Sequence, residues 1–322
     1  MFYWSTLAFL CAAVVALWLL DDIYRWRSNL VYYTHKDLDA PLEVMVRERW
    51  EPLNKLSIAE LDAAIQEVAS EDGFRVGQLS VRRNTSSLLA TAARALCDPV
   101  VTVALISPAK FHFGTSFRPD FQGCTAKERL NSEQAVMAIT ANFRDPEGKP
   151  LGWVYHKGQM VNRPFPKWTG AFFVKNGTPY FGPKSLIDEI QGEIEEGSQV
   201  YPSVMKNHTV FGYVDLSPDK HFDGRRVTYR ALAGTRRDGT VIFVLSGEGG
   251  VMTVSEVTAI AEKLQVQHAT LLDGGRALQY SMQLNGDRVR HFTAFNTQVT
   301  SGPAWAQAQR SPVYIVIKRK TS

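Results

Sequence analysis

The sequence is poor in cysteine and lacks the motifs of several common enzyme classes. Its three cysteines, Cys11, Cys97 and Cys124, have no metal-ligand spacing with the seven scattered histidines, so we expect no metal. No Ser-His-Asp order is evident, and Gly247–Val251 lacks the Lys-Ser/Thr of a phosphate-binding P-loop. We therefore expect no nucleotide and no other cofactor. Cys97 and Cys124 either form a disulfide, if the body is exported, or remain two buried thiols.

The chain also lacks a dense block of basic or acidic residues. The net charge of +4 is spread along the sequence, and basic residues do not alternate with aromatic residues on any face. This pattern argues against nucleic-acid binding. A hydrophobic fraction of 45% over 322 residues is enough for a large core in one or two domains.

Only one stretch of the chain is long and continuously apolar. It runs from Phe2 to Leu20 and ends at Asp21-Asp22. A helix of this length can span a bilayer, so residues 1–20 are predicted to be a transmembrane anchor or a signal segment, with membrane attachment through residues 2–20. The apolar stretch continues past a possible cleavage site at Cys11, which favours an uncleaved anchor. Arg25 and Arg27 follow the segment, and the positive-inside rule would place the body in the cytoplasm.

Residues 21–97 are predicted to be a stem followed by a small helical region. The stretch Asp21–Asp39 holds Trp26, Tyr32 and Tyr33, aromatic residues that suit a membrane surface. A capping box at Ser57 opens an amphipathic helix that we expect to reach about Ser70 and to end at Gly73. A second helix is expected over Ser86–Leu96.

From residue 98 the pattern changes to strands, which predicts a main domain over 98–322. Short apolar or alternating runs with strand character lie at Val100–Ser107, Lys110–Phe117, Val136–Thr140 and Val313–Lys318. A helix is expected over Thr125–Ala135. The fold class predicted is therefore α+β: a layered, strand-rich domain with a few packed helices.

The most informative local feature is Asp273, which is followed by Gly274 and Gly275. The apolar run Ala269–Leu272 has strand length and ends at this carboxylate. Two glycines allow a sharp turn and the close approach of a ligand. A carboxylate at the end of a strand beside such a turn is a plausible place for chemistry, although an Asp that only caps its own turn is an equal alternative.

The elements before Asp273 follow a definite order. Two strands, Tyr229–Thr235 and Thr240–Ser246, flank an Asp238-Gly239 turn. A helix with a Thr253/Glu256 capping box follows and leads into the Ala269–Leu272 strand. With Arg230 on the first strand and Leu272-Asp273-Gly274-Gly275 at the end, this order resembles the phosphodiester glycosidase family.

Earlier segments carry the same resemblance, which covers roughly Asp98 to the C-terminus. Asn142-Phe143 followed by Pro150-Leu151-Gly152 is similar to the family's Asn-aromatic block and its hairpin. An aromatic hairpin turns at Asn176-Gly177, and Gln199 with Pro202 resembles a Gln-x-x-Pro segment.

The resemblance implies a hydrolase that releases a sugar from a glycosyl phosphodiester or a polysaccharide such as an exopolysaccharide. It implies Asp273, Arg230 and Asn142 as catalytic residues: Asp273 as base or stabiliser of the anomeric centre, Arg230 as phosphate clamp, and Asn142 as a hydrogen-bonding group. Gly274, Gly275, Arg276 and Gln199 are expected to contact substrate. Because the family acts outside the cytoplasm, it also implies an extracytoplasmic body, against the Arg25/Arg27 flank.

A second interpretation stays open. Arg276-Ala277-Leu278 stands where the family has two small residues, and Phe143-Arg144 stands where it has small residues after the Asn. Both segments are expected to lie where the substrate binds. They favour a non-catalytic carbohydrate- or phosphosugar-binding protein, or an envelope assembly protein, on the same scaffold. A third, weaker hypothesis is a tethered scaffold that recruits a partner through its helical region.

Overall fold

The computed structural model describes residues 11–13, 15–16, 26–36, 38–212, 222–294 and 310–320. Its α-helices are α2 (Trp26–His35), α3 (Ile58–Ala64), α4 (Leu88–Ala95), α5 (Ala126–Ser132), α6 (Leu186–Glu189) and α7 (Val254–Lys263). Short 3-10 helices are η1 (Leu53–Lys55) and η2 (Gly275–Ala277).

Twenty strands are described. They are β1 (Leu42–Val46), β2 (Arg49–Pro52), β3 (Gln66–Glu71), β4 (Phe74–Arg83), β5 (Val100–Ile106), β6 (Phe111–Phe117), β7 (Met137–Thr140), β8 (Val154–His156), β9 (Gln159–Asn162), β10 (Gly170–Lys175), β11 (Thr178–Pro183), β12 (Glu196–Val200), β13 (Ser203–Lys206), β14 (Thr209–Val210), β15 (Ala231–Arg236), β16 (Val241–Ser246), β17 (Val266–Leu271), β18 (Gln279–Leu284), β19 (Asp287–Thr293) and β20 (Val313–Arg319).

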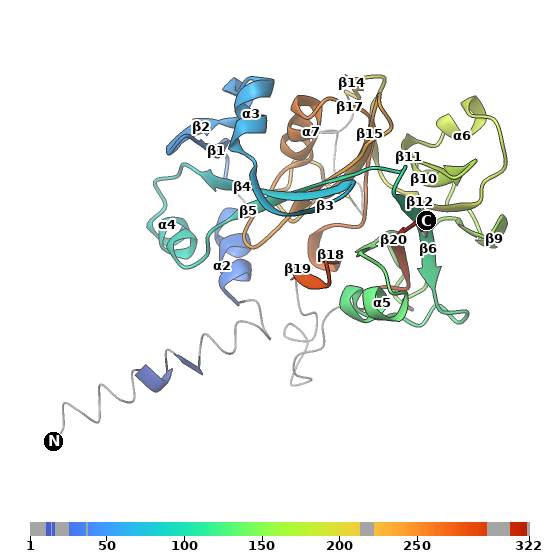
Figure 1. The fold of residues 1–322 in the computed structure, drawn as a ribbon. Coiled ribbons are helices and arrows are strands. Elements are labelled where there is room, and N and C mark those ends of the chain that lie inside the picture. The colour runs from blue at the N-terminus through green and yellow to red at the C-terminus, as the bar shows by residue number, and fades with distance from the viewer. Residues whose placement is uncertain are drawn as a thin grey trace.

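These strands form one large sheet and two smaller ones. The large sheet has ten strands in the order β14-β13-β17-β15-β16-β5-β4-β1-β2, with β3 on β4. The smaller sheets run β11-β10-β12-β8-β9 and β19-β18-β7-β20-β6. Figure 1 shows α3 and α7 together on one side of the large sheet, with α2 and α4 toward the other side. The strand-rich α+β prediction is confirmed.

The core lies on both faces of the large sheet, and strand β16 shows why. Val241, Phe243 and Leu245 point into a core shared with the two smaller sheets. Ile242 and Val244 point the other way, into a core shared with α3 and α7. Successive side chains of a strand alternate between faces, so a strand covered on both sides reads as a continuous apolar run.

Several local predictions are confirmed. Asp238-Gly239 joins β15 and β16 as an antiparallel hairpin. The helix after it, α7, begins at the predicted capping box, with Thr253 and Glu256 each bonding the other's backbone amide. The predicted strand before Asp273 is β17, which pairs with β15. The Asn176-Gly177 turn joins β10 and β11.

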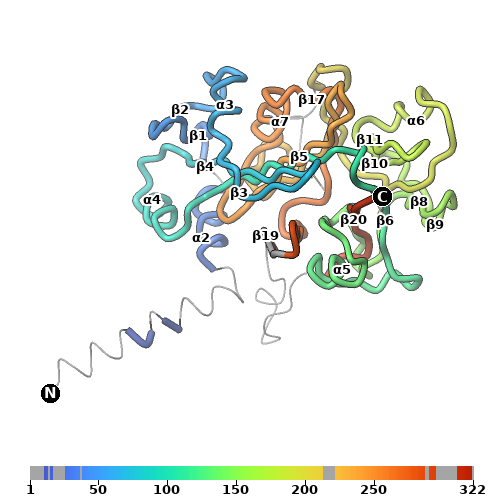
Figure 2. The backbone as a smooth tube through the Cα atoms, viewed as in Figure 1, coloured from blue at the N-terminus to red at the C-terminus, as the bar shows by residue number. Residues whose placement is uncertain are grey.

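The prediction of a small helical region is corrected. Helix α3 begins at the predicted capping box but ends at Ala64, and the next residues form strand β3 instead of continuing the helix. Asp72-Gly73 is the hairpin turn between β3 and β4, not a helix stop. The cause is tertiary, since the long strand β4 offers an edge that pairs with residues 66–71. Figure 2 shows β3, β4 and β5 running alongside one another.

The predicted boundary between residues 97 and 98 separates two strands of one sheet. Strand β4 pairs with β5 over seven residues, from Phe74↔Ile106 to Ser80↔Val100. Helix α4 is present, but its buried residues are Ala90 and Ala93, whereas Leu88 is 87% exposed. Residues 38–97 thus form part of the layered body.

The N-terminal predictions fall largely outside the described residues. Of the apolar run Phe2–Leu20, only residues 11–13 and 15–16 are described. Within the described part of the chain, no helix has both the length and the apolar composition needed to cross a bilayer. Cys97 and Cys124 are both buried free thiols.

The stem prediction is corrected for residues 26–36. This segment forms α2, and Tyr32 is buried at 3% exposure instead of facing a surface. Its ring stacks on Tyr229 at a centroid separation of 5.9 Å. The Ser28 hydroxyl lies 2.6 Å from the Tyr229 hydroxyl and accepts a bond from the Gly249 amide. Helix α2 is therefore packed into the body.

Candidate active site

A cavity of about 350 Å³ lies where the carboxyl end of β17 meets the start of β15. Its wall combines one helix residue, the loop before β15, the strand ends and the double-glycine turn. The lining residues are Tyr32, Phe143, Phe222, Asp223, Arg226, Thr228, Arg230, Ala231, Leu271, Leu272, Gly274, Gly275 and Arg276. Four of the seven site residues expected from the sequence, Arg230, Gly274, Gly275 and Arg276, thus share one cavity.

The double-glycine turn is held against the neighbouring strand by its backbone. The Gly275 amide donates to the Tyr229 carbonyl at 2.7 Å, and the Asp273 amide donates to the Ala141 carbonyl at 3.2 Å. A Cβ at Gly274 would lie 2.9 Å from the Tyr229 carbonyl oxygen, closer than a side chain tolerates. Gly275 has a φ of +57°, in the left-handed region that favours glycine. Both glycines are therefore required by this turn.

Asp273 follows Leu272 and precedes Gly274, which both line the cavity, and it is 4% exposed. Burial raises the pKa of its carboxyl to about 8; the positive charge of Arg144 and the Gly274 amide lower it only in part. Within the described part of the chain, no cation forms an ion pair with this carboxyl. A carboxylic acid held in such surroundings keeps its proton near neutral pH.

Arg230 is the most deeply buried cation of the cavity, at 6% exposure. Its Nη2 donates to the carbonyls of Asp223 and Arg226, each at 2.7 Å, and its Nε donates to the Met252 carbonyl at 3.3 Å. The guanidinium lies over the Phe222 ring. Desolvation lowers the pKa of Arg230 to about 10, so the group remains charged at neutral pH. Nη1 has no hydrogen-bond partner among the described residues.

Asn142 and Gln199 are placed differently from the other expected residues. The Asn142 amide is fully buried, donates to the carbonyls of Leu151 and Gln199, and accepts a bond from the Ser198 hydroxyl. The Gln199 side chain bonds backbone groups of the 153–168 segment. Neither residue lines the cavity. Both amides instead hold the 143–168 segment against β12, and of that segment only Phe143 lines the cavity.

The structure adds wall residues that the sequence analysis did not select. Arg226 and Thr228 come from the loop before β15. Arg144, named above with Phe143, is not a wall residue, but its positive charge lowers the pKa of Asp273. The proximity of Arg226 and Thr228 to Arg230 in sequence is a signal that could have identified them. Tyr32 has no such signal, because it is far from the rest of the site in sequence.

Comparison with known proteins gives relatives in fold. No curated protein matches the chain. Three solved structures are similar in fold, at 12–14% identity and covering 80–81% of this chain. They are the zebrafish N-acetylglucosamine-1-phosphodiester alpha-N-acetylglucosaminidase catalytic domain, auto-inhibited by its pro-peptide (TM-score 0.55, 82% of that chain covered), a hypothetical protein from Synechocystis (0.50, 64%), and a Burkholderia pseudomallei protein described as exported (0.50, 88%).

The sequence itself gives the family. A family model for phosphodiester glycosidases matches residues 133–316, which is more than half of the chain and includes the double-glycine turn, Arg230 and Asn142. The chain therefore belongs to the phosphodiester glycosidase family.

Proposed function

We propose that this protein hydrolyses glycosyl phosphodiesters, releasing the sugar from an extracytoplasmic glycan or glycoconjugate. The observation that carries the proposal is a buried carboxyl, Asp273, next to a cavity lined by three arginines, Arg226, Arg230 and Arg276. A phosphodiester substrate needs cationic groups for its phosphate and a carboxyl group near the anomeric carbon. The extracytoplasmic location is supported by the fold shared with the exported Burkholderia protein.

Arg230 is suited to orient the phosphate. Its bonds to the Asp223 and Arg226 carbonyls fix the plane of the guanidinium, so little side-chain entropy remains to be lost when a ligand binds. Arg226 and Arg276 add positive charge on the same wall. Charge-assisted bonds to phosphate oxygens are among the stronger contacts available to a protein.

The raised pKa of Asp273 suggests a role for its proton. At neutral pH the carboxyl can donate this proton to the departing phosphate oxygen as the bond between that oxygen and the anomeric carbon breaks. The carboxylate left behind stabilises the positive anomeric centre. A water molecule then forms the new bond to carbon and returns a proton to Asp273. This differs from a role for Asp273 as a permanently ionised base.

The test is release of sugar from a panel of glycosyl phosphodiesters by the wild-type protein and by Asp273→Asn. Asparagine keeps the shape of the side chain but cannot transfer the proton, so turnover should fall by on the order of 100-fold or more. Asp188→Asn, which changes an exposed aspartate outside the cavity, is the matched control and should be unaffected.

Two outcomes would contradict the proposal. If folded Asp273→Asn cleaves as fast as the wild type, Asp273 does not carry the chemistry. If the wild type binds these compounds and cleaves none, the alternative of a non-catalytic phosphosugar-binding or assembly protein replaces hydrolysis.

A further inference from the structure

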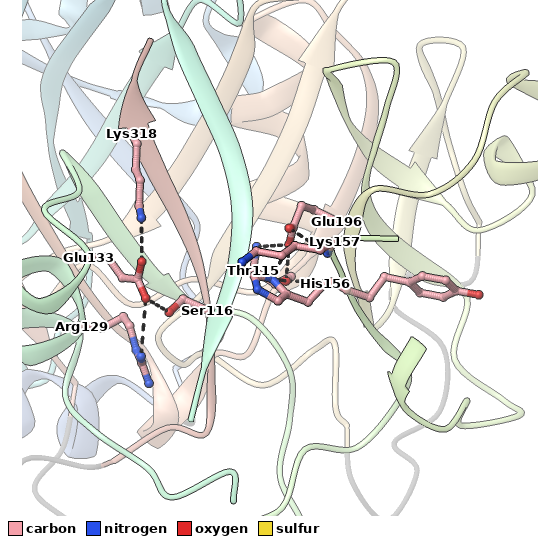
Figure 3. Close-up of polar contacts among 9 residues, drawn as sticks. Thr115, Ser116, Arg129, Glu133, His156, Lys157, Glu196 and Lys318 are labelled. Carbon is pink, nitrogen blue, oxygen red and sulfur yellow. Dashed lines mark hydrogen bonds and ion pairs between the residues drawn. The ribbon is translucent and has the colours of Figure 1, made fainter. Parts of the chain in front are cut away.

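A second cavity, of about 540 Å³, lies between β6, β8, β12 and β20. It shares no lining residue with the cavity beside Asp273. Figure 3 shows two polar clusters at this place, one around Glu133 and one around Glu196, on either side of β6. Neither cluster has a part in the proposed hydrolysis.

The carboxylate of Glu196 is saturated with donors from the protein. Its Oε2 accepts bonds from the Thr115 amide at 2.9 Å, from the Thr115 hydroxyl, and from His156 Nδ1 at 3.1 Å. Its Oε1 accepts the Lys157 amide at 3.1 Å. Because Nδ1 of His156 is used in this bond, Nε2 is the ring nitrogen left for a ligand. The imidazole is therefore oriented before any ligand arrives.

The carboxylate of Glu133 is occupied in the same way on the other side of β6. It accepts bonds from Lys318 Nζ at 2.6 Å and from the Ser116 hydroxyl, and Arg129 Nη1 lies 3.8 Å away. Lys318 is held by Glu133, and its ammonium group has two further N–H bonds to offer. Its side chain is 42% exposed, so these donors can reach a ligand.

The hydrogen-bonding capacity that remains in this cavity is mainly on the donor side. His112 and Lys157 are exposed lining residues whose side chains form no bond among the described residues. With Lys318 they provide three donor groups, while both lining carboxylates are already satisfied. His156, whose Nδ1–H bonds Glu196, offers Nε2 as an acceptor in its neutral form, which can take the hydroxyl proton of a phosphate. Phe117 adds an apolar surface beside them, with its ring edge-on to His156 at 5.4 Å between centroids.

We propose that this second cavity binds the phosphate group of a phosphorylated sugar. Phosphate presents several strong acceptor oxygens in different directions, which suits donors that approach from both sides of β6. An apolar ring next to the donors suits the face of a sugar. This proposal rests on the second cavity alone and does not require the Asp273 site to be catalytic.

Lysine acetylation with mass spectrometry tests the site locally. The full chain is acetylated in the presence of inorganic phosphate, glucose 1-phosphate or glucose. We expect both phosphate compounds to slow the modification of Lys157 and Lys318 severalfold, with glucose 1-phosphate acting at lower concentration and glucose having no effect. Lys184, an exposed lysine outside the cavity, is the internal control. Protection by inorganic phosphate alone would overturn the sugar-phosphate assignment, since it would indicate a plain anion site.

Unchanged labelling of both lysines under every condition would overturn the proposal, as would equal protection by glucose. A double variant, His112→Gln with Lys157→Asn, supplies the second measurement. Asparagine suits the positive φ of Lys157, so the turn should be preserved. Protection of Lys318 should then need about tenfold more glucose 1-phosphate, as expected for a loss of about 1.4 kcal/mol.

The same double variant separates this inference from the proposed function. Sugar release at the Asp273 site should be unaltered in it for small substrates. Loss of lysine protection with sugar release intact supports the second site. Intact protection in the double variant contradicts it, whether or not the protein proves to be a hydrolase.

Discussion

Asp273 is buried and Glu133 is half-buried, and their pKa values move in opposite directions. Burial raises the pKa of Asp273 to about 8, because only the charge of Arg144 and the Gly274 amide oppose it. Burial also opposes ionisation of Glu133, but hydrogen bonds from Lys318 and Ser116 outweigh it and leave the pKa of Glu133 below its ordinary value. A carboxyl therefore keeps its proton where burial is deep and donors are few, and loses it where burial is partial and donors are close.

The largest expected effect comes from removing the titrating group of Asp273. The folded-state pKa is raised, so stability is highest below the unfolded pKa of 3.8 and declines as the pH rises toward about 8. This loss is on the order of 4 kcal/mol at pH 7. Asp273→Asn should avoid it and be more stable than the wild type at pH 8, with the difference shrinking toward pH 4. Denaturant unfolding across this range measures it, and a pH-independent difference would contradict the assignment.

The next effect concerns the pH dependence of activity. If Asp273 acts as the proton donor, kcat/KM should fall about tenfold per pH unit above pH 8. A rate that rises through pH 8 would instead identify an ionised base. Arg144→Gln removes a charge that favours ionisation of Asp273, so the alkaline limb should move to higher pH. Circular dichroism at each pH provides the control for folding.

Arg230→Lys should weaken binding of the substrate phosphate without changing the pH dependence set by Asp273. Lysine keeps the charge but cannot serve three carbonyls and a phosphate at once, so KM should rise about tenfold while kcat changes little. Weaker bonding to the Asp223 and Arg226 carbonyls should also reduce the free energy of unfolding by about 1–3 kcal/mol. Steady-state kinetics and denaturant titration give the two quantities. A fall in kcat with KM unchanged would argue against phosphate binding by Arg230.

The smallest effect is expected at Glu133, where Lys318→Met removes a principal donor. The pKa of Glu133 should rise, and stability at pH 7 should fall by about 1 kcal/mol or less, because Lys318 is 42% exposed. Because the pKa of Glu133 is lower in the folded state than its unfolded value of 4.5, its ionisation contributes stability above that pH. The stability difference between Lys318→Met and the wild type should therefore vanish in acid. Lys184→Met is the matched control. A large loss at every pH would mean that Lys318 acts through packing.

Features that depend on neighbouring residues were predictable from the sequence. The capping boxes at Ser57 and Thr253 each satisfy free amides within one turn, and each marks a helix start in the structure. The Asp238-Gly239 turn and the strand before Asp273 are similarly local. Local patterns fix these elements because few alternative partners compete with them.

Features that depend on distant partners were not predictable in the same way. Asp72-Gly73 and Asp238-Gly239 are the same dipeptide in hairpin turns, yet the first was interpreted as a helix stop because a capping box preceded it. The amides of Asn142 and Gln199 bond carbonyls brought near by folding, and no spacing in the sequence indicates those partners. The sequence therefore predicts the fold class more completely than it predicts the lining of the cavity.

The position of Tyr32 has a spectroscopic consequence. Its ring stacks on Tyr229, which meets Phe292 edge-on at 5.4 Å, and Phe292 in turn stacks on Tyr280 at 5.4 Å. Four aromatic rings in fixed mutual orientation should give strong near-ultraviolet circular dichroism, a signal that depends on rigid tertiary packing. The first ring belongs to α2 and the last to β18. This signal would therefore report, in the intact chain and without an added label, whether α2 is packed against the cavity.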